Sequence, residues 1–370
     1  MSREILLTQP VLERICSNLN IEEANSLRIS LNLKSLACSL TIIDPKTSRK
    51  IVLPEINAQI QKVHSLILKN GLDVALISAI SEPNKNLRRQ LVLILLKLGV
   101  NVNIQDQADE NFFPLLMAVA KQDFEIVEIL LNAGADINLF EVYGFTALMS
   151  AAANLNENIL LLLLKKGAGK INIEAVDTSG NTALMVAAQR GRNKNVKILA
   201  AAGANINATN RYGETALIMA SREGRKEVVQ TLISLGADIH IQDIGGHTAF
   251  SIAVLLNEKG VAEILLKAGA NVNHIYRDGG SLLRRTVEQE NIEMIKFLLD
   301  VGANVNILDR DGSTALMMAA YFKSVEIAKM LIDRRANVNI ANERGTTALK
   351  IAINNHDDKL VQLLRKVGAH

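Results

Sequence analysis

Tryptophan is absent from this chain of 370 residues, and aromatic residues make up only 3% of it. Hydrophobic residues nevertheless form 49% of the sequence, which is too apolar for intrinsic disorder. The core must therefore consist mainly of Leu, Ile, Val, Ala and Met, a composition that suits packed helices. Because one compact core rarely serves a chain of this length, we expect several domains or an array that grows by addition.

Cysteine is scarce, long apolar runs are lacking, and charge is nearly balanced. Cys16 and Cys38 both lie in apolar segments, which favours a reducing compartment, so we expect a cytoplasmic protein. No apolar run approaches the roughly 20 residues of a membrane span, and the N-terminus lacks the pattern of a signal peptide. The net charge is +3 without a run of five Lys or Arg, so we expect no nucleic-acid partner.

Motifs of known catalytic chemistry are also missing. The sequence has no glycine-rich phosphate loop, HExxH or GxSxG motif. Its histidines are scattered; His240, His247 and His274 fall near adjacent hairpins, but without Cys or paired carboxylates at ligand spacing. We therefore predict a non-enzymatic protein with no catalytic residue, cofactor or metal. An unfamiliar enzyme within the first 70 residues, using Cys16 or Cys38 with His64, is the least favoured alternative.

What the chain does contain is one phrase repeated in register: Gly-x-Thr-Ala-Leu, then Ala-Ala, Leu-Leu and Gly-Ala-Asn/Asp-Ile/Val-Asn. The Thr position recurs every 33 residues, except for one step of 36, at Phe113, Thr146, Thr182, Thr215, Thr248, Ser281, Thr314 and Thr347. The phrase resembles the ankyrin family, whose repeat is about 33 residues long with a T-P-L-H-x-A motif. Ala replaces the family's Pro in most copies, and residues such as Met149 and Lys350 replace its His.

The resemblance implies an all-α solenoid of about nine helix-turn-helix repeats with short hairpin loops. The expected domains are an F-box-like helical segment at 1–40, a linker and helix at 41–71, and the ankyrin-repeat domain at 72–370. A hairpin or extended linker is expected at 41–54, and a loop insertion within the first repeat at 81–86. The expected repeats are 72–107, 108–140, 141–176, 177–209, 210–242, 243–275, 276–308, 309–341 and 342–370.

Single positions of the phrase have a physical role. Thr followed by Ala-Leu suits a helix N-cap, whose hydroxyl accepts a hydrogen bond from a free backbone N–H. The glycine two residues earlier, such as Gly213, stands where a tight turn needs a positive φ, and Asn111 fills that slot once. One isolated helix pair cannot bury all the apolar side chains of its second helix, so the pairs must stack on one another.

Ankyrin proteins bind their targets through hairpin tips and the exposed side of the first helix, so the resemblance nominates a protein-binding face here. Aromatic and Arg residues gather at these variable positions, and both kinds of side chain anchor interfaces. Each Arg could equally be an ordinary solvated charge, and each aromatic could pack on a neighbouring hairpin. The predicted partner-binding residues are Phe112, Tyr143, Phe145, Arg190, Arg211, Tyr212, Arg222, Leu255, Tyr276, Arg277, Arg310, Tyr321 and Phe322.

Residues 1 to about 70 do not fit the repeat, and the first 40 have helical apolar spacing of their own. They resemble a degenerate F-box, the module that docks on the adaptor subunit of cullin-type ubiquitin ligases, although Leu7-Thr8 replaces its Leu-Pro start. A helical cap on the first repeat explains the same pattern, and both interpretations stay open. The residues that would bind the adaptor are Leu7, Val11, Leu12, Ile15, Leu19, Ala24, Leu27 and Leu31.

Together these features predict a protein-interaction scaffold that recruits a target to a cullin-type ubiquitin ligase. F-box and ankyrin modules combine in effectors of intracellular bacteria, so secretion into a host cytosol is part of this expectation. The alternative is an ankyrin module that blocks or bridges a partner without a ubiquitin-ligase link. We expect the chain to be a monomer.

Overall fold

The computed structural model describes residues 42–43, 50–51, 62–63, 65–67, 72–105 and 113–370. The F-box-like segment, Cys16, Cys38, Asn111 and Phe112 lie outside these described residues. The chain divides into two compact units, of which the first holds residues 1–151 and 156–172 and the second holds 152–155 and 173–370. The border at residue 172 falls in the hairpin that contains the single step of 36 residues.

The first unit contains a small strand pair and the first helix pairs. β1 (Ile42–Ile43) pairs antiparallel with β2 (Lys50–Ile51), so the segment at 41–54 contains a hairpin rather than an extended linker. Its helices are α4 (Leu72–Ile80), α5 (Lys85–Lys97), α6 (Pro114–Ala120), α7 (Phe124–Asn132), α9 (Asn158–Lys166) and most of α8 (Ala147–Ala153).

The loop within the first repeat is shorter than we expected. Asn84 caps α5 by accepting a 3.1 Å hydrogen bond from the Leu87 N–H, so the helix begins at Lys85. The prediction of an insertion through residue 86 was therefore wrong at its C-terminal end. Because the Asn84 side chain caps the helix at this point, Lys85 and Asn86 belong to α5 rather than to the loop.

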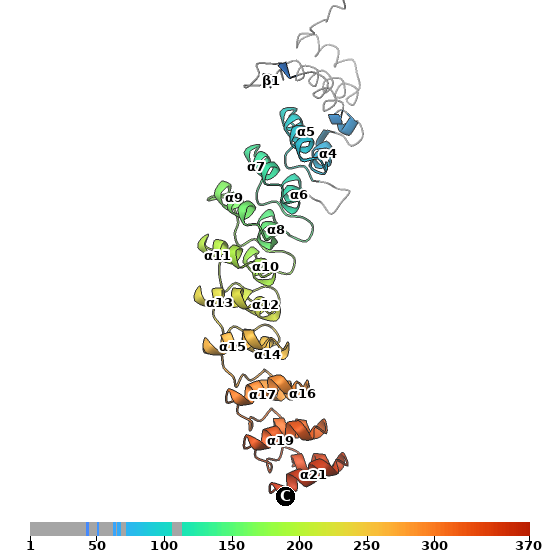
Figure 1. Ribbon diagram of the computed structural model, residues 1–370, viewed down its shortest axis with the longest axis vertical. Helices are drawn as coiled ribbons and strands as arrows, with labels where there is room; N and C mark the ends of the chain where they lie inside the picture. Colours follow the sequence, from blue (N-terminus) through green and yellow to red (C-terminus); the bar gives the residue numbers. More distant parts are fainter. Residues whose placement is uncertain (1–41, 44–49, 52–61, 64, 68–71, 106–112) are drawn as a thin grey trace, which may run out of the picture. The chain divides into compact units, whose positions relative to one another are not determined.

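The second unit repeats one pair of antiparallel helices (Figure 1). Its first helices are α10 (Ala183–Gln189), α12 (Ala216–Arg222), α14 (Ala249–Leu255), α16 (Leu282–Glu288), α18 (Ala315–Tyr321) and α20 (Ala348–Asn354). Its second helices are α11 (Asn193–Ala201), α13 (Lys226–Ser234), α15 (Lys259–Lys267), α17 (Ile292–Asp300), α19 (Val325–Asp333) and α21 (Asp358–Lys366). We call these the inner and outer helices.

Stacking stabilises these helices, because seven or nine residues are too few for a stable isolated helix. Leu217 of α12 is 1% exposed, and Leu232 of α13 is completely buried. Phe250 and Phe297, the two aromatics that we placed in the core, are 1% and 7% exposed. The all-helical solenoid expected from the repeat is confirmed, with the β1–β2 pair as its only strands among the described residues.

The predicted helix caps and turn glycine are both present. The hydroxyl of Thr215 accepts a 3.2 Å hydrogen bond from the Ile218 N–H, and the other Thr and Ser of the phrase do the same. Gly213 has a φ of +73°, as the turn requires. A Cβ there would also lie 3.1 Å from both the Asp243 Cα and the Ile244 N, so glycine lets the next hairpin approach.

Asparagine side chains link successive repeats at the ends of their outer helices. The Asn207 Oδ1 accepts a 2.9 Å hydrogen bond from the Asp238 N–H, 31 residues later. Equivalent bonds start from Asn103, Asn138, Asn273, Asn306 and Asn339, and from the carboxylate of Glu174. We call each bond a rung. Within residues 173–370, the step from His240 to Asn271 has none, because an exposed His replaces the asparagine.

Candidate functional site

The hairpins between repeats are rigid at their base and open at their tip. In the hairpin at 210–214, the Asn210 Oδ1 accepts 2.9 Å hydrogen bonds from the N–H groups of Tyr212 and Glu214. Asp177, Asp309 and Asn342 do the same in their own hairpins. Side-chain oxygens that bind N–H groups two and four residues ahead fix the turn locally. The two tip residues are therefore free to vary.

Tyr212 occupies such a tip and presents its ring to solvent. Its side chain is 53% exposed, while its backbone oxygen accepts a 2.9 Å hydrogen bond from Ile244 of the next hairpin. Arg211 beside it is exposed, and its N–H donates to the Ser179 oxygen of the preceding hairpin at 3.0 Å. The backbone of the tip is thus held on both sides. A partner would meet these side chains without reordering the loop, which reduces the entropic cost of binding.

The C-terminal end of α18 carries a second exposed aromatic group. Tyr321 is 64% exposed and Phe322 is 36% exposed, and their rings meet edge to face with centroids 5.4 Å apart. An aromatic pair held in this way is a partly rigid apolar surface. Leu255 and Leu256 hold the equivalent positions at α14, where Leu255 is half-buried and Leu256 is 48% exposed.

In the first unit, the hairpin at 140–146 carries the predicted aromatics. Tyr143 is 58% exposed, whereas Phe145 is half-buried. Phe140 and Val142 of the same hairpin are 61% and 56% exposed, which makes this tip the most apolar one described in this unit. We did not predict Val142, because we singled out aromatic and Arg residues at the tips. Ile244 of the second unit, 63% exposed, was missed for the same reason.

The predicted Arg residues are at the surface, but not all are equally available. Arg190, Arg211, Arg277 and Arg310 are exposed. The guanidinium of Arg310 donates to the backbone oxygen of Arg277, which orients it along the hairpins. Arg222 forms an ion pair with the carboxylate of Glu214, itself only 7% exposed. Arg222 is therefore positioned by its own chain, and a partner would have to compete with Glu214 for it.

Tyr276 is the one predicted binding residue among those described that the structure buries. It is 4% exposed and stands where other hairpins have the Asp or Asn that fixes the turn. Its ring lies edge-on to His247 and His274, with centroids 5.3 Å and 4.7 Å away, and the Arg285 guanidinium lies 4.3 Å above it. The prediction that Tyr276 contacts a partner was wrong, because these neighbours enclose the ring. We call the four residues the Tyr276 cluster.

Burial shifts the pKa values of two residues of this cluster, His274 and Tyr276. The His274 side chain is 5% exposed, and its Nε2 donates a 2.8 Å hydrogen bond to the Gly246 oxygen. Burial lowers the pKa of His274; the hydrogen bond opposes this shift, while His247 and Arg285 add to it. Burial raises the pKa of Tyr276 to about 12. Both groups are therefore kept neutral at pH 7.

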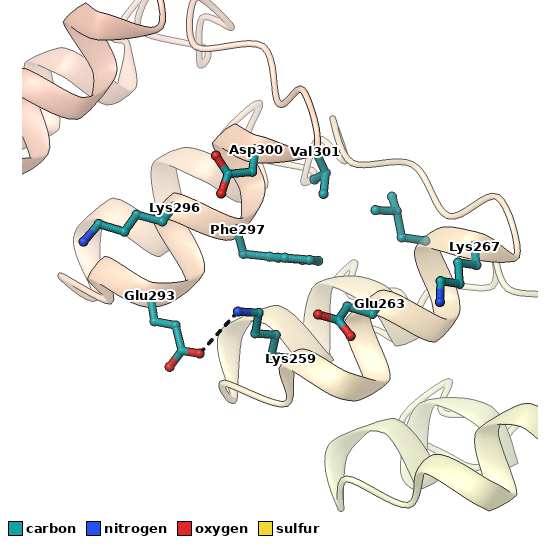
Figure 2. Close-up of a pocket in the computed structure, with 9 residues that line it drawn as sticks. Lys259, Glu263, Lys267, Glu293, Lys296, Phe297, Asp300 and Val301 are labelled. Atoms are coloured by element: carbon teal, nitrogen blue, oxygen red, sulfur yellow. Dashed lines mark ion pairs between the residues drawn. The ribbon is translucent and has the colours of Figure 1, made fainter.

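On the outer side of the same two repeats, a groove of about 560 Å³ separates α15 from α17 (Figure 2). Phe297 forms its apolar wall, and the Lys259 Nζ lies 3.7 Å from the Glu293 Oε1 across it. Three lysines and three carboxylates line the groove. Their charges cancel, so the groove does not favour a ligand of either sign. The charged residues are Lys259, Lys267, Lys296, Glu263, Glu293 and Asp300.

The described part of the chain contains no group of three or more His, Cys, Asp or Glu side chains that could hold a metal ion. None of its helices is both long and apolar enough to cross a membrane.

Comparison with known proteins agrees with the helix pairs. A model of ankyrin repeats in three copies matches residues 76–175, 169–243 and 283–370, and a single ankyrin repeat model matches 245–277. These matches cover well over half of the chain. Between residues 76 and 370, the matches omit residue 244 and residues 278–282. Residues 278–282 adjoin Tyr276, where the hairpin departs from the pattern of the others.

Several curated proteins are similar over part of their length. The chain is 34% identical to the nuclear factor NF-kappa-B p105 subunit of Gallus gallus over 138 residues, 36% of this chain and 14% of that protein. It is 30% identical to ankyrin repeat and SOCS box protein 6 of Homo sapiens over 210 residues, 55% of this chain and 46% of that protein. An ankyrin repeat protein of Acanthamoeba polyphaga mimivirus is 37% identical over 119 residues, 31% of this chain and 72% of that protein. With the matched repeats and their hairpins in place, the chain belongs to the ankyrin-repeat family.

Proposed function

We propose that this chain is an interaction scaffold that holds a protein target on the hairpin tips and inner-helix ends of its repeats. The observation that supports this proposal is that Tyr143, Tyr212 and Tyr321 are exposed on repeats whose backbones are fixed. Only four tyrosines occur in the whole chain, so three of them are at variable surface positions. Exposed tyrosines on a rigid backbone are well suited to anchor an interface.

Charge indicates what kind of target surface would fit. Between residues 178 and 213 the chain has five cations, Arg190, Arg192, Lys194, Lys197 and Arg211, and no Asp or Glu. Arg190 and Arg211 belong to the proposed binding face, and Arg211 lies beside Tyr212. We propose that the target presents acidic and apolar groups together, since Arg pairs with carboxylates and Tyr packs on apolar surface.

The test is a triple substitution of Tyr212, Tyr321 and Phe322 by alanine. A partner captured from a eukaryotic lysate and then purified should bind this variant at least about fivefold more weakly, the equivalent of about 1 kcal/mol. The circular dichroism and melting temperature should stay close to those of the parent, because all three side chains are exposed.

The matched control removes exposed apolar groups elsewhere, with Leu235 and Val367 replaced by alanine; these are 40% and 41% exposed. The control should bind as the parent does. Equal binding by the triple variant and the parent would place the site outside these repeats.

The finer proposal is that residues 1–40 bind the adaptor subunit of a cullin-type ubiquitin ligase, so that the bound target is ubiquitinated. Its support is the F-box-like spacing of Val11, Leu12, Ile15 and Leu19. One relative, ankyrin repeat and SOCS box protein 6, carries a second module besides its ankyrin repeats, as its name states. In the same proposal the chain acts in the cytoplasm of a host cell, as an effector delivered by a bacterium.

A pull-down with purified adaptor tests this half of the proposal. The full chain should capture the adaptor at micromolar concentrations, and Leu12→Asp with Ile15→Asp should abolish capture, because a buried charge without a partner prevents docking. The same variant should keep its affinity for the target. If the parent chain captures no adaptor, the simple ankyrin module that blocks or bridges a partner becomes the better description.

A further inference from the structure

The junction between repeats 243–275 and 276–308 combines several departures from the pattern of the second unit. At three others, a backbone N–H of one hairpin donates to a backbone oxygen of the preceding hairpin. These bonds run from Arg211 to Ser179, Ile244 to Tyr212 and Glu343 to Asp311, at 2.9–3.0 Å. Within residues 173–370, no such bond joins the hairpins at 243–247 and 276–280, or those at 276–280 and 309–313. At the first of these two junctions, the His274 imidazole supplies the link instead, by donating to the Gly246 oxygen. At the second, the Arg310 guanidinium donates to the Arg277 oxygen.

Two further departures occur at the same junction. The rung between His240 and Asn271 is missing, although each flanking step within the second unit has one. The outer helices α15 and α17 enclose the groove described above, so packing on that side is incomplete (Figure 2). Three independent links between neighbouring repeats are thus replaced or absent at one place. In a solenoid, stability is a sum over neighbouring interfaces, so a weak interface opens locally.

We propose that this junction is an acid-sensitive seam, at which the stack opens before any other junction of the second unit when the pH falls below about 6.5. The geometry explains the sensitivity. The imidazole that replaces the backbone bond is enclosed by Tyr276, by His247 of the preceding hairpin and by Arg285 of α16. Proton uptake by His274 would place a new charge beside these cationic or titratable groups.

The nearby carboxylates do not offset that charge, because each already has a partner. Asp243 Oδ1 lies 3.1 Å from the His247 Nδ1, and Asp278 Oδ2 accepts a 2.7 Å hydrogen bond from Arg285. On α16, Arg284 pairs with both Glu288 at 2.9 Å and Asp309 at 3.2 Å. Ser251 of α14 is uncharged and bonds to the Thr248 backbone. The closed seam therefore favours neutral His274.

The sign of the pH effect follows from proton linkage. Burial lowers the pKa of His274 in the closed seam, whereas in the open seam the group titrates near its ordinary value of 6.5. The open state therefore binds more protons between these two values, and closure weakens as the pH falls through 6.5. One proton changes the equilibrium for opening by up to about tenfold per pH unit. Above pH 7.5 the seam should keep its full stability.

Opening would have a consequence for binding. Tyr212 precedes the seam along the chain, and Tyr321 follows it. A partner that contacts both would lose one of them when the two sides separate. This consequence rests on the proposed function, but the seam itself does not.

Hydrogen–deuterium exchange of the full chain without any partner tests the seam directly. We would compare pH 7.5 with pH 5.5, after correction for the intrinsic exchange rate, and follow peptides from α14 and α16 against peptides from α10 and α12. Protection in α14 and α16 should fall at pH 5.5, by up to about tenfold, while α10 and α12 change much less. A uniform loss along residues 177–370 would overturn the proposal.

Two variants assign the effect to His274. His274→Gln keeps a donor for the Gly246 oxygen but does not titrate, so its exchange in α14 and α16 should not depend on pH in this way. His274→Ile, which copies Ile241, Ile307 and Ile340 at the equivalent position, serves if the Gln variant fails to fold. His356→Asn, which removes an exposed histidine from the last repeat, should keep the parental pH dependence. A parental pH dependence in either His274 variant that folds would also overturn the proposal.

Discussion

At the scale of single residues, Gly213 is constrained twice, by its positive φ of +73° and by the backbone of the next hairpin. We predict that Gly213→Val lowers the free energy of unfolding by on the order of 1–3 kcal/mol, because a β-branched residue is strained at positive φ. The added side chain must also displace the backbone at Asp243. Urea denaturation followed by circular dichroism would measure the loss, and an unchanged midpoint would contradict our description of the turn.

Gly345 separates the two causes. It has a φ of +67°, but a Cβ there would meet no atom within 4 Å. Gly345→Val should therefore cost only the backbone strain and destabilise less than Gly213→Val. Equal losses at the two sites would mean that the close approach of hairpins contributes nothing measurable.

Tyr276 gives a second prediction at this scale. Because burial raises the pKa of Tyr276 to about 12, this tyrosine should ionise only at strongly alkaline pH. In the unfolded chain the pKa of tyrosine is about 10, so the folded state holds the Tyr276 proton more tightly. The stability from this group is complete below pH 10 and is lost as the pH rises toward 12.

Absorbance at the tyrosinate band during an alkaline titration would check the raised pKa of Tyr276. The parent should show one late ionisation, coincident with loss of the fold, and Tyr276→Phe should lack it. A Tyr212→Phe variant, which loses an exposed phenol, should keep the late step. Ionisation of Tyr276 near pH 10 while the chain is still folded would contradict its burial.

At the scale of elements, the missing rung predicts a stabilising change. In His240→Asn, the new Oδ1 would stand where Asn207 and Asn273 accept the N–H 31 residues later. The Asn271 N–H should then donate to it, and the free energy of unfolding should rise by about 0.5–1.5 kcal/mol. Urea denaturation at pH 7.5 would measure the gain.

His240→Ala is the matched control, because it removes the same imidazole without adding an acceptor. This control should not gain stability. If both variants are stabilised equally, the imidazole itself is harmful and the rung plays no part.

The elements that the sequence predicted correctly depend on local chemistry. Thr215 caps α12 and Gly213 turns the hairpin through contacts within a few residues, and both are visible in the repeated phrase. The burial of Tyr276 was not predictable in this way. It depends on His247 in the preceding hairpin and on Arg285 in the following helix, and a single aromatic at a variable position looks the same whether it is exposed or enclosed.

At the scale of the whole molecule, the proposed binding face is a sum of separate hairpins rather than one continuous pocket. Each hairpin presents its own tip, and the repeats of the second unit contact their neighbours along the chain. Tip residues such as Tyr212 can therefore change without disturbing the core beneath them, since Leu217 and Phe250 supply that core. The same separation explains why the sequence predicts the fold well but leaves the identity of the target open.

The rungs have a further consequence for how such a gene could change its length. The bonds from Asn207 to Asp238 and from Asn273 to Asn304 both span 31 residues and occupy the same place in their repeats. An in-frame deletion of residues 210–242 would remove one whole period, bring Thr209 next to Asp243, and set the Asn207 oxygen opposite the Asn271 N–H. The shortened protein would lose His240 and regain a rung at the junction where the full chain lacks one. Contraction or duplication by whole periods can thus change the span of the proposed binding face and the strength of an internal joint in a single genetic event.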